Sequence, residues 1–282
     1  MTDADEPHAA PGATAGRPLA RHERRGPVAT FTLDSPRNRN ALSARLLGEL
    51  FAGLQEVQAD PDVRVVVLTG EGSVFCSGLD LDERLHPPAT PGSATLAEVL
   101  SSLHALPQPV VARVNGHVRA GGMGLVAACD LAVAPERATF AFTEVRVGVA
   151  PAIIAVPALA LMGRRAFARY ALTGDVFDAD EAVAAGLLSA AAPDTAAMDE
   201  WVTSVVAALL RSAPSAVAAT KELPGLVGGQ PWDEAMTVAE SLSAELFAAP
   251  AGTEGMAAFL EKRAPAWTVA WPPEDAARPR GG

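Results

Sequence analysis

The chain has 282 residues and a formal net charge of −11; hydrophobic residues make up 49% of it and charged residues 20%. This length allows one large domain, or one domain with a smaller appendage, and the composition is that of an ordinary globular protein. The acidic charge, without any dense Lys/Arg run, disfavours nucleic-acid binding.

The two cysteines, Cys76 and Cys129, form no CxxC pair, and the five histidines show no ligand spacing on a shared helix face. This usage disfavours a disulfide framework or a metal site and fits a reducing compartment. No apolar run approaches the length of a membrane span, and residues 1–18 lack the apolar core of a secretory signal. We therefore expect a cytoplasmic protein with no membrane partner.

Strand-like and helix-like segments alternate along the first half of the chain. Ser43 is a candidate N-cap for a helix whose leucines fall on one stripe, and the polar, proline-bearing stretch 81–91 predicts a loop. Strands are predicted at 28–33, 64–69, 110–114, 131–134 and 139–143, and further helices at 93–104 and 121–129. This alternation predicts a buried, largely parallel sheet with right-handed crossovers.

Beyond Pro157 the pattern becomes helical. Helices are predicted at 164–172, 180–185, 198–210, 214–221, 232–247 and 252–262. The Ala/Pro/Gly-rich start and the end from Pro272 onward predict disordered tails. The predicted organisation is a tail (1–20), an α/β core (21–212), a helical part for subunit contacts (213–265) and a second tail (266–282).

Two glycine-rich turns follow strand-like runs. The first is Phe75-Cys76-Ser77-Gly78-Leu79-Asp80 and the second is Asn115-Gly116-His117-Val118-Arg119-Ala120-Gly121-Gly122-Met123-Gly124. Glycine at a strand exit permits a sharp turn and close approach of a ligand. If the two turns lie side by side, two backbone N–H groups can point at one oxygen atom and form an oxyanion hole.

The order of several motifs identifies the chain as resembling the crotonase, or enoyl-CoA hydratase/isomerase, superfamily. The resemblance covers residues 28–263 and rests on the two turns together with Asn38-Arg39-Asn40-Ala41-Leu42, Val66-Val67-Leu68-Thr69-Gly70, Pro109-Val110-Val111-Ala112-Arg113-Val114-Asn115-Gly116, Cys129-Asp130, Leu172-Thr173-Gly174 and the closing segment 254–263. It implies an α/β fold: a crotonase-like β/α spiral core with a helical C-terminal trimerisation part. It also implies an acyl-CoA substrate and a homotrimer or dimer of trimers.

The resemblance assigns roles to residues in both turns. The N–H groups of Leu79 and Gly121 would stabilise the enolate oxygen, with Gly121 at a helix start where the dipole favours negative charge. The remaining implied substrate contacts are Cys76, Gly78, Asp80, Leu81, Gly122 and Gly124. No separate cofactor is implied, since coenzyme A is part of the substrate.

Two-carboxylate hydratases of this family carry one glutamate just after the Gly-Gly turn and another about twenty residues later. The first position is Gly124 in this chain, and the second is Glu144. Glu144 is therefore the predicted acid/base, with a pKa that burial would raise toward the working pH. The segment 144–154 resembles a subset without the first glutamate, which includes methylglutaconyl-CoA hydratases.

Several other side chains are weaker candidates. His117 and Arg119 flank the second turn and would meet an acidic acyl group or the CoA phosphates, although surface contacts are the commoner role. Asp82, Glu83 and His86 are candidates to replace the missing carboxylate. Arg24, Arg25, Lys262 and Arg263 are weak candidates for phosphate contacts, and Cys76 is expected to be a core residue, not a nucleophile.

The first expectation for function is hydration of a 2-enoyl-CoA, with a branched or glutaconyl-type acyl group as one option. Double-bond isomerisation needs only one carboxylate and comes second. Decarboxylation or thioester hydrolysis on the same oxyanion hole comes third. A non-catalytic acyl-CoA-binding protein is the alternative of a different class, and RNA binding is disfavoured by the charge.

Overall fold

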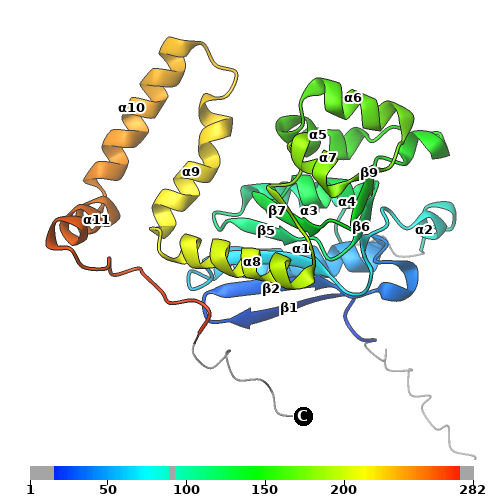
Figure 1. Cartoon of the computed structure of the whole chain (residues 1–282), viewed down its shortest axis with the longest axis horizontal. Coiled ribbons are helices and arrows are strands. Elements are labelled where there is room, and N and C mark those ends of the chain that lie inside the picture. The colour runs from blue at the N-terminus through cyan, green and yellow to red at the C-terminus, as the bar shows by residue number, and fades with distance from the viewer. Residues whose placement is uncertain (1–15, 89–92, 274–282) are drawn as a thin grey trace, which may run out of the picture.

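The computed structural model describes residues 16–88 and 93–273. Most of the predicted N-terminal tail, the end of the predicted loop 81–91 and residues 274–282 lie outside the described residues. Figure 1 shows a mixed α/β body with a helical arm extending from one side.

The main sheet has six strands in the order β1-β2-β3-β5-β7-β10. Strand β1 is antiparallel to β2, and every other neighbouring pair is parallel. The strands are β1 (Ala20–Arg25), β2 (Val28–Leu33), β3 (Val65–Gly70), β5 (Val110–Arg113), β7 (Leu131–Pro135) and β10 (Ala190–Ala192). The predicted parallel α/β core is therefore confirmed.

A second, smaller sheet contains the short strands β4 and β6 that lead into the two glycine turns. Its order is β4-β6-β8-β9, with β4, β6 and β8 parallel and β9 antiparallel to β8. The strands are β4 (Val74–Cys76), β6 (His117–Arg119), β8 (Thr139–Ala141) and β9 (Phe177–Asp178). Because parallel strands end at the same edge, the segments that follow β4, β6 and β8 leave the sheet together.

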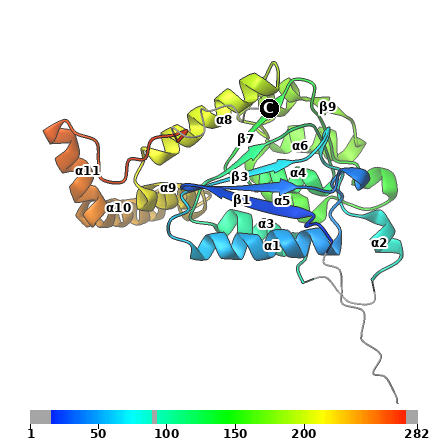
Figure 2. The ribbon, with the colours of Figure 1, turned by 90° about the horizontal axis from the view of Figure 1, so that it is seen from below.

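Helices cover both faces of the main sheet, which explains why β3 is buried along its whole length. Figure 2 shows α1 and α3 on one side and α8 on the other. The body helices are α1 (Ala44–Ala59), α2 (Leu81–Leu85), α3 (Leu96–Ala105), α4 (Gly121–Ala127), α5 (Ala152–Leu161), α6 (Arg164–Thr173), α7 (Ala179–Ala184) and α8 (Thr195–Leu210), with 3₁₀ turns η1 (Pro36–Asn38) and η2 (Glu144–Val147). Ser43 accepts the Leu46 N–H and caps α1 as predicted.

The structure corrects two local predictions. Residues 81–85 form the short helix α2 where a loop was expected, because the Asp80 carboxylate accepts the N–H groups of Asp82 and Glu83 and starts the helix. Strand β1 was not predicted, since its sequence ARHERR is mostly exposed at the sheet edge and has no apolar alternation.

The arm consists of α9 (Pro214–Val227), α10 (Trp232–Ala248) and α11 (Pro250–Glu261). Within these helices Ala258 alone is buried, and large apolar side chains such as Trp232, Phe247 and Phe259 are exposed. Lys221 of α9 joins the arm to the body through an ion pair with Asp130 at 2.9 Å. Among the described residues, no single helix is long and apolar enough to cross a membrane, although the bent pair α8 and α9 together has the length and composition.

Candidate active site

The two glycine turns lie against each other. A Cβ atom built on Gly78 would lie 3.4 Å from the Gly121 nitrogen, and one built on Gly121 would lie 3.6 Å from the Leu79 nitrogen. Gly78 has a φ of +98°, a conformation that glycine adopts without strain. A side chain at Gly78 would also meet Ala120 at 2.8 Å, so glycine is required there.

The Leu79 N–H group is left free by the bridge between Leu79 and Leu42. Leu42 donates its N–H to Gly78 and accepts from Asp80, so the strand-like bridge uses the residues on either side of Leu79. Among the described residues, neither the Leu79 N–H nor the Gly121 N–H has a hydrogen-bond acceptor. Two adjacent donors without acceptors match the geometry that an oxyanion hole needs.

Apolar side chains and strained backbone surround the donors. Leu42 and Leu96 stand 3.0 and 3.3 Å from where a Gly121 Cβ would lie, and they line the donors with hydrocarbon. Ala120, which precedes Gly121, has a φ of +46°. Positive φ at a non-glycine residue is costly and occurs often at functional sites, and here it turns the chain from β6 into α4.

Cys76 packs in the interior of the site. A Cβ on Gly122 would lie only 2.8 Å from the Cys76 Cβ, so the close packing of Cys76 requires glycine at position 122. Burial raises the pKa of the Cys76 thiol to about 12. The thiol is therefore protonated at neutral pH, as expected of a core residue and not of a nucleophile.

Glu144 begins the turn η2, three residues after β8 ends. Strand β8 is parallel to β6, and Ala141 accepts the Ala120 N–H at 3.0 Å, which brings the Glu144 segment beside the second glycine turn. The side chain is half-buried, and its Oε2 atom is buried with no hydrogen-bond partner among the described residues. This desolvation raises the pKa of the Glu144 carboxyl, which suits a group that exchanges protons.

Ile154 of α5 fills the space beside Gly124. A Cβ on Gly124 would lie 2.5 Å from the Ile154 Cγ2 atom and 3.2 Å from the Leu100 Cδ1 atom. Ile154 is buried and apolar. In the part of the chain that the structure describes, the nearest atoms to a Gly124 Cβ are therefore hydrocarbon, from Ile154 and Leu100.

The acidic residues near the first turn have other roles. Asp80 caps α2 and contacts Asn38, while Leu81 is 57% exposed at the start of that helix. Glu83 accepts the Ala44 N–H at the start of α1. Asp82 and His86 contact each other at 3.2 Å with side chains that are 88% and 76% exposed, so neither is buried at the glycine turns.

His117 and Arg119 brace the small sheet. The Arg119 guanidinium donates to the carbonyl and the hydroxyl of Thr139, and His117 contacts the same hydroxyl at 2.8 Å. Burial and the charges of Arg119 and Arg137 lower the pKa of His117. Both side chains therefore hold β6 against β8.

Three of the four candidates for CoA phosphate contacts, Arg24, Arg25 and Arg263, are already engaged or distant, and Lys262 is exposed at the end of α11. Arg24 pairs with Asp60 and Asp62, and Arg25 lies opposite Val28, at the end of the main sheet away from Gly70. Arg263 pairs with Glu254, whose pKa it lowers to about 2. None of these contacts supports a role at the glycine turns.

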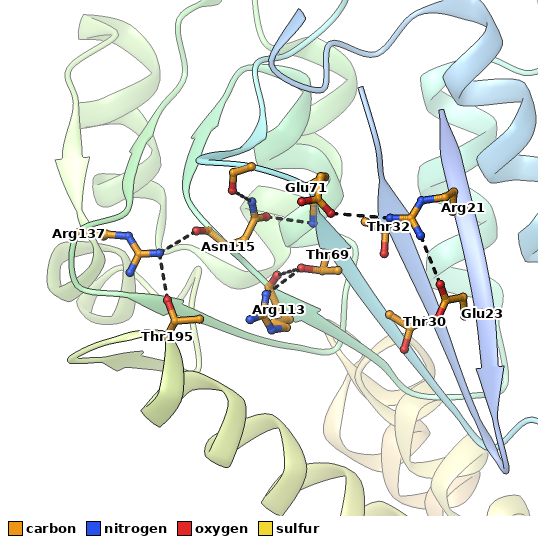
Figure 3. Close-up of a pocket in the computed structure, with 12 residues that line it drawn as sticks. Arg21, Glu23, Thr30, Thr32, Thr69, Glu71, Arg113, Asn115, Arg137 and Thr195 are labelled. Atoms are coloured by element: carbon orange, nitrogen blue, oxygen red, sulfur yellow. Dashed lines mark hydrogen bonds and ion pairs between the residues drawn. The ribbon is translucent and has the colours of Figure 1, made fainter. Parts of the chain in front are cut away.

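Two buried asparagines were not singled out from the sequence. Asn40 and Asn115 both hydrogen-bond the turn 70–74 that connects β3 to β4. Figure 3 shows Asn115 between this turn and Arg137, at the edge of a polar cavity of about 400 Å³. Most of its lining consists of charged and hydroxyl side chains on the face of the main sheet that α8 covers. None of the predicted site residues lines this cavity.

Comparison with known proteins identifies the family. The sequence model of the enoyl-CoA hydratase/isomerase family matches residues 23–270. A Thermus thermophilus protein, named as a candidate enoyl-CoA hydratase, is 35% identical over 86% of this chain and 97% of its own. Human enoyl-CoA hydratase domain-containing protein 3, mitochondrial, is 32% identical over 86% of this chain and 80% of its own.

Solved structures give the same result. Pseudomonas aeruginosa AtuE has a TM-score of 0.82 and 33% identity, covering 89% of this chain and 100% of that one. The Mycobacterium smegmatis enoyl-CoA hydratase has a TM-score of 0.81 and 34% identity, covering 89% and 99%. The family match spans most of the sequence, and the fold is shared along nearly the whole of each relative. The chain belongs to the enoyl-CoA hydratase/isomerase family, within the crotonase superfamily.

Proposed function

We propose that the protein hydrates a 2-enoyl-CoA at the site formed by Leu79, Gly121 and Glu144. The observation that carries the proposal is the pair of adjacent N–H groups without acceptors, beside a half-buried carboxyl group whose Oε2 atom is also unpartnered. Such a site offers two donors for a developing oxyanion and one group for proton transfer.

In the proposed reaction the thioester oxygen accepts both N–H groups. The water oxygen bonds to the β carbon as the double-bond electrons move toward the thioester oxygen and form an enolate. Glu144 accepts a proton from that water and then delivers a proton to the α carbon, so that one water is added across the double bond. CoA remains attached to the substrate throughout, and the proposed chemistry uses no separate cofactor.

Isomerisation is the second candidate, and the packing at Gly124 is the observation that favours it. Ile154 fills the space beside Gly124 with hydrocarbon, so the proposed site uses Glu144 alone, and a single carboxylate suffices to move a proton between the α and γ carbons. A branched or glutaconyl-type acyl group is proposed only on the resemblance of the segment 144–154. The Leu42 and Leu96 side chains support an apolar environment near the thioester.

Mass spectrometry of a 2-enoyl-CoA panel, including 3-methylglutaconyl-CoA, tests the reaction. With wild type we expect a product heavier by one water, and with Glu144→Gln a loss of roughly a hundredfold or more. Glu136→Gln, a change at an exposed glutamate in the turn before β8, is the matched control and should retain the wild-type rate.

Other outcomes separate the alternatives. A substrate whose mass is unchanged in ordinary water, and which takes up deuterium from deuterated buffer only when Glu144 is present, would indicate isomerisation and contradict hydration. Loss of carbon dioxide or release of free CoA would indicate decarboxylation or hydrolysis. Acyl-CoA binding without product or deuterium uptake would contradict an enzyme and indicate a binding protein.

A trimer or a dimer of trimers is proposed on the exposed apolar surfaces. Phe259 and Leu260 of the arm are 82% and 79% exposed, and Val156 and Leu172 of the body are each 77% exposed. Two separate apolar surfaces on one chain suit a head-to-tail contact that closes into a ring. Light scattering should give three or six times the chain mass, and a monomer would contradict this. The cytoplasmic location stays a prediction.

A further inference from the structure

We propose that Asn115 and Asn40 are positioning residues for the oxyanion hole: together they clamp the turn 70–74 and so fix the direction of the Leu79 N–H. This inference rests on the proposed use of that N–H as a donor to the thioester oxygen. It assigns a functional consequence to two buried amides that do not themselves face the substrate.

Asn115 holds the turn from one side. Its Oδ1 atom accepts the Gly70 N–H at 3.0 Å, and its Nδ2 atom donates to the Gly72 carbonyl at 2.8 Å. The residue is 7% exposed, and its own carbonyl accepts from Arg137, as Figure 3 shows. Both ends of this amide are therefore committed to one short segment.

Asn40 hydrogen-bonds two further carbonyls of the same turn. Its Nδ2 atom donates to the carbonyls of Glu71 and Val74, at 3.0 and 2.8 Å, and its Oδ1 atom accepts the Ser35 N–H at 2.8 Å. Asn40 is fully buried and has a φ of +55°. The left-handed backbone makes this contact possible at a cost that the three side-chain hydrogen bonds offset.

Two points of the turn are closely packed, while residues 71–73 themselves are exposed. A Cβ on Gly70 would lie 2.8 Å from the Asn115 Oδ1 atom and 3.1 Å from the Asn40 Nδ2 atom. A Cβ on Gly116 would lie 2.0 Å from the Ser73 carbonyl oxygen. Gly70 therefore lies against both amides, and Ser73 lies against the Gly116 backbone.

The clamped turn leads without interruption to the donor. Strand β4 starts at Val74, whose carbonyl Asn40 binds, and it ends at Cys76. The next N–H, of Ser77, donates to the Arg39 carbonyl at 3.1 Å, and the Gly78 carbonyl accepts from Leu42 at 2.8 Å. The segment 39–42 therefore holds both ends of the path to Leu79, and a shift of the turn reaches the donor within five residues.

Asn115→Ala tests the clamp, with Gln108→Ala as its matched control. Gln108 is also a buried amide, 8% exposed, and it precedes β5 whereas Asn115 follows it. It donates to the Val57 carbonyl, away from the turn 70–74. Both variants lose a buried amide beside the same strand, and only one of them loses a contact to the turn.

Two readouts separate positioning from loss of stability. The first is kcat, which we expect to fall roughly tenfold to a hundredfold in Asn115→Ala, with little change in acyl-CoA affinity. The second is the infrared C=O stretch of a bound, ¹³C-labelled saturated acyl-CoA. The downshift that the two donors cause should fall by at least half in Asn115→Ala and persist in Gln108→Ala.

Asn115→Asp provides a variant that keeps the side-chain volume. It retains an acceptor for Gly70 and loses the donor to Gly72, so we expect an intermediate loss in both readouts. A wild-type downshift and wild-type kcat in both Asn115 variants would overturn the clamp. A C=O downshift that is present in wild type and reduced in the Asn115 variants, without any turnover, would uphold the clamp and contradict hydration. If wild type itself shows no C=O downshift, the clamp is overturned.

Discussion

The Leu79–Gly121 half of the site and the Glu144 half differ in how their surroundings are built. Backbone hydrogen bonds and glycine contacts hold the first half, and two buried amides bind the turn 70–74 that precedes it. The second half is one half-buried carboxyl group with an unpartnered Oε2 atom, and packed hydrocarbon from Ile154 fills the space beside Gly124.

This difference follows from the kind of chemical group that each half uses. The donors are main-chain groups, so they depend on turn geometry that only a narrow set of residues can adopt. The proton-transfer group is a side chain, so a single substitution can remove or add one. In the proposed mechanism the first half stabilises charge on the oxygen, and the second half decides which reaction follows.

Gly78→Ala breaks the donor half and has the largest expected effect. The new Cβ would lie 2.8 Å from the Ala120 Cβ, at a φ of +98°, so the two turns must move apart. We expect kcat to fall roughly a hundredfold to a thousandfold, as for the loss of one oxyanion donor. Steady-state kinetics on the substrate identified by mass spectrometry measures this.

Gly26→Ala controls for backbone strain alone. Gly26 also has positive φ, +54°, but a Cβ there meets no atom within 4 Å. We expect it to lose stability and to keep the wild-type kcat. Equal loss of kcat in both variants would contradict a specific contact between the turns.

Gly124→Ala and Ile154→Ala test whether Ile154 fills the space beside Gly124 in the Glu144 half of the site. Alone, the first overpacks the site against Ile154 and should destabilise the fold by about 1–3 kcal/mol. Alone, the second leaves a cavity and should cost about 2–5 kcal/mol. The double variant should cost clearly less than the sum in urea unfolding, and simple additivity would show that Ile154 does not occupy this space.

The pH dependence of stability gives the smallest expected effect. Burial raises the folded-state pKa of Glu144, so the folded chain binds this proton more tightly than the unfolded chain does. The free energy of unfolding therefore falls as pH rises through the two pKa values. Glu144→Gln, which stays neutral, should be more stable than wild type at pH 7, with the difference shrinking toward pH 4. A wild type with a larger free energy of unfolding than Glu144→Gln at pH 7 would contradict a raised pKa of Glu144 in the folded chain.

Much of the donor half could be predicted from the sequence because a glycine-rich turn after a strand-like run is a local signal, although the contacts that require glycine join distant segments. Gly78, Gly121 and Gly122 each follow a strand and stand where a side chain would clash, and the order of the motifs gave the family. The main parallel strands were predicted for the same reason, since Val65–Gly70 is an uninterrupted buried run.

The remainder depends on contacts between distant segments. Ile154 fills the Gly124 space from a helix thirty residues away, and the sequence carries no sign of this contact. Asn40 and Asn115 were present in the quoted motifs, but their hydrogen bonds to the turn 70–74 need the fold. An asparagine directly after a buried strand and before glycine was the available signal for Asn115.

A crystal structure with a bound, non-reactive saturated acyl-CoA tests the central claim most directly. We predict the thioester oxygen within roughly 2.7–3.1 Å of both the Leu79 and the Gly121 nitrogen, with the Glu144 carboxyl facing the α and β carbons. A thioester oxygen bound away from these two nitrogens, for example in the polar cavity beside Arg113, would contradict the account.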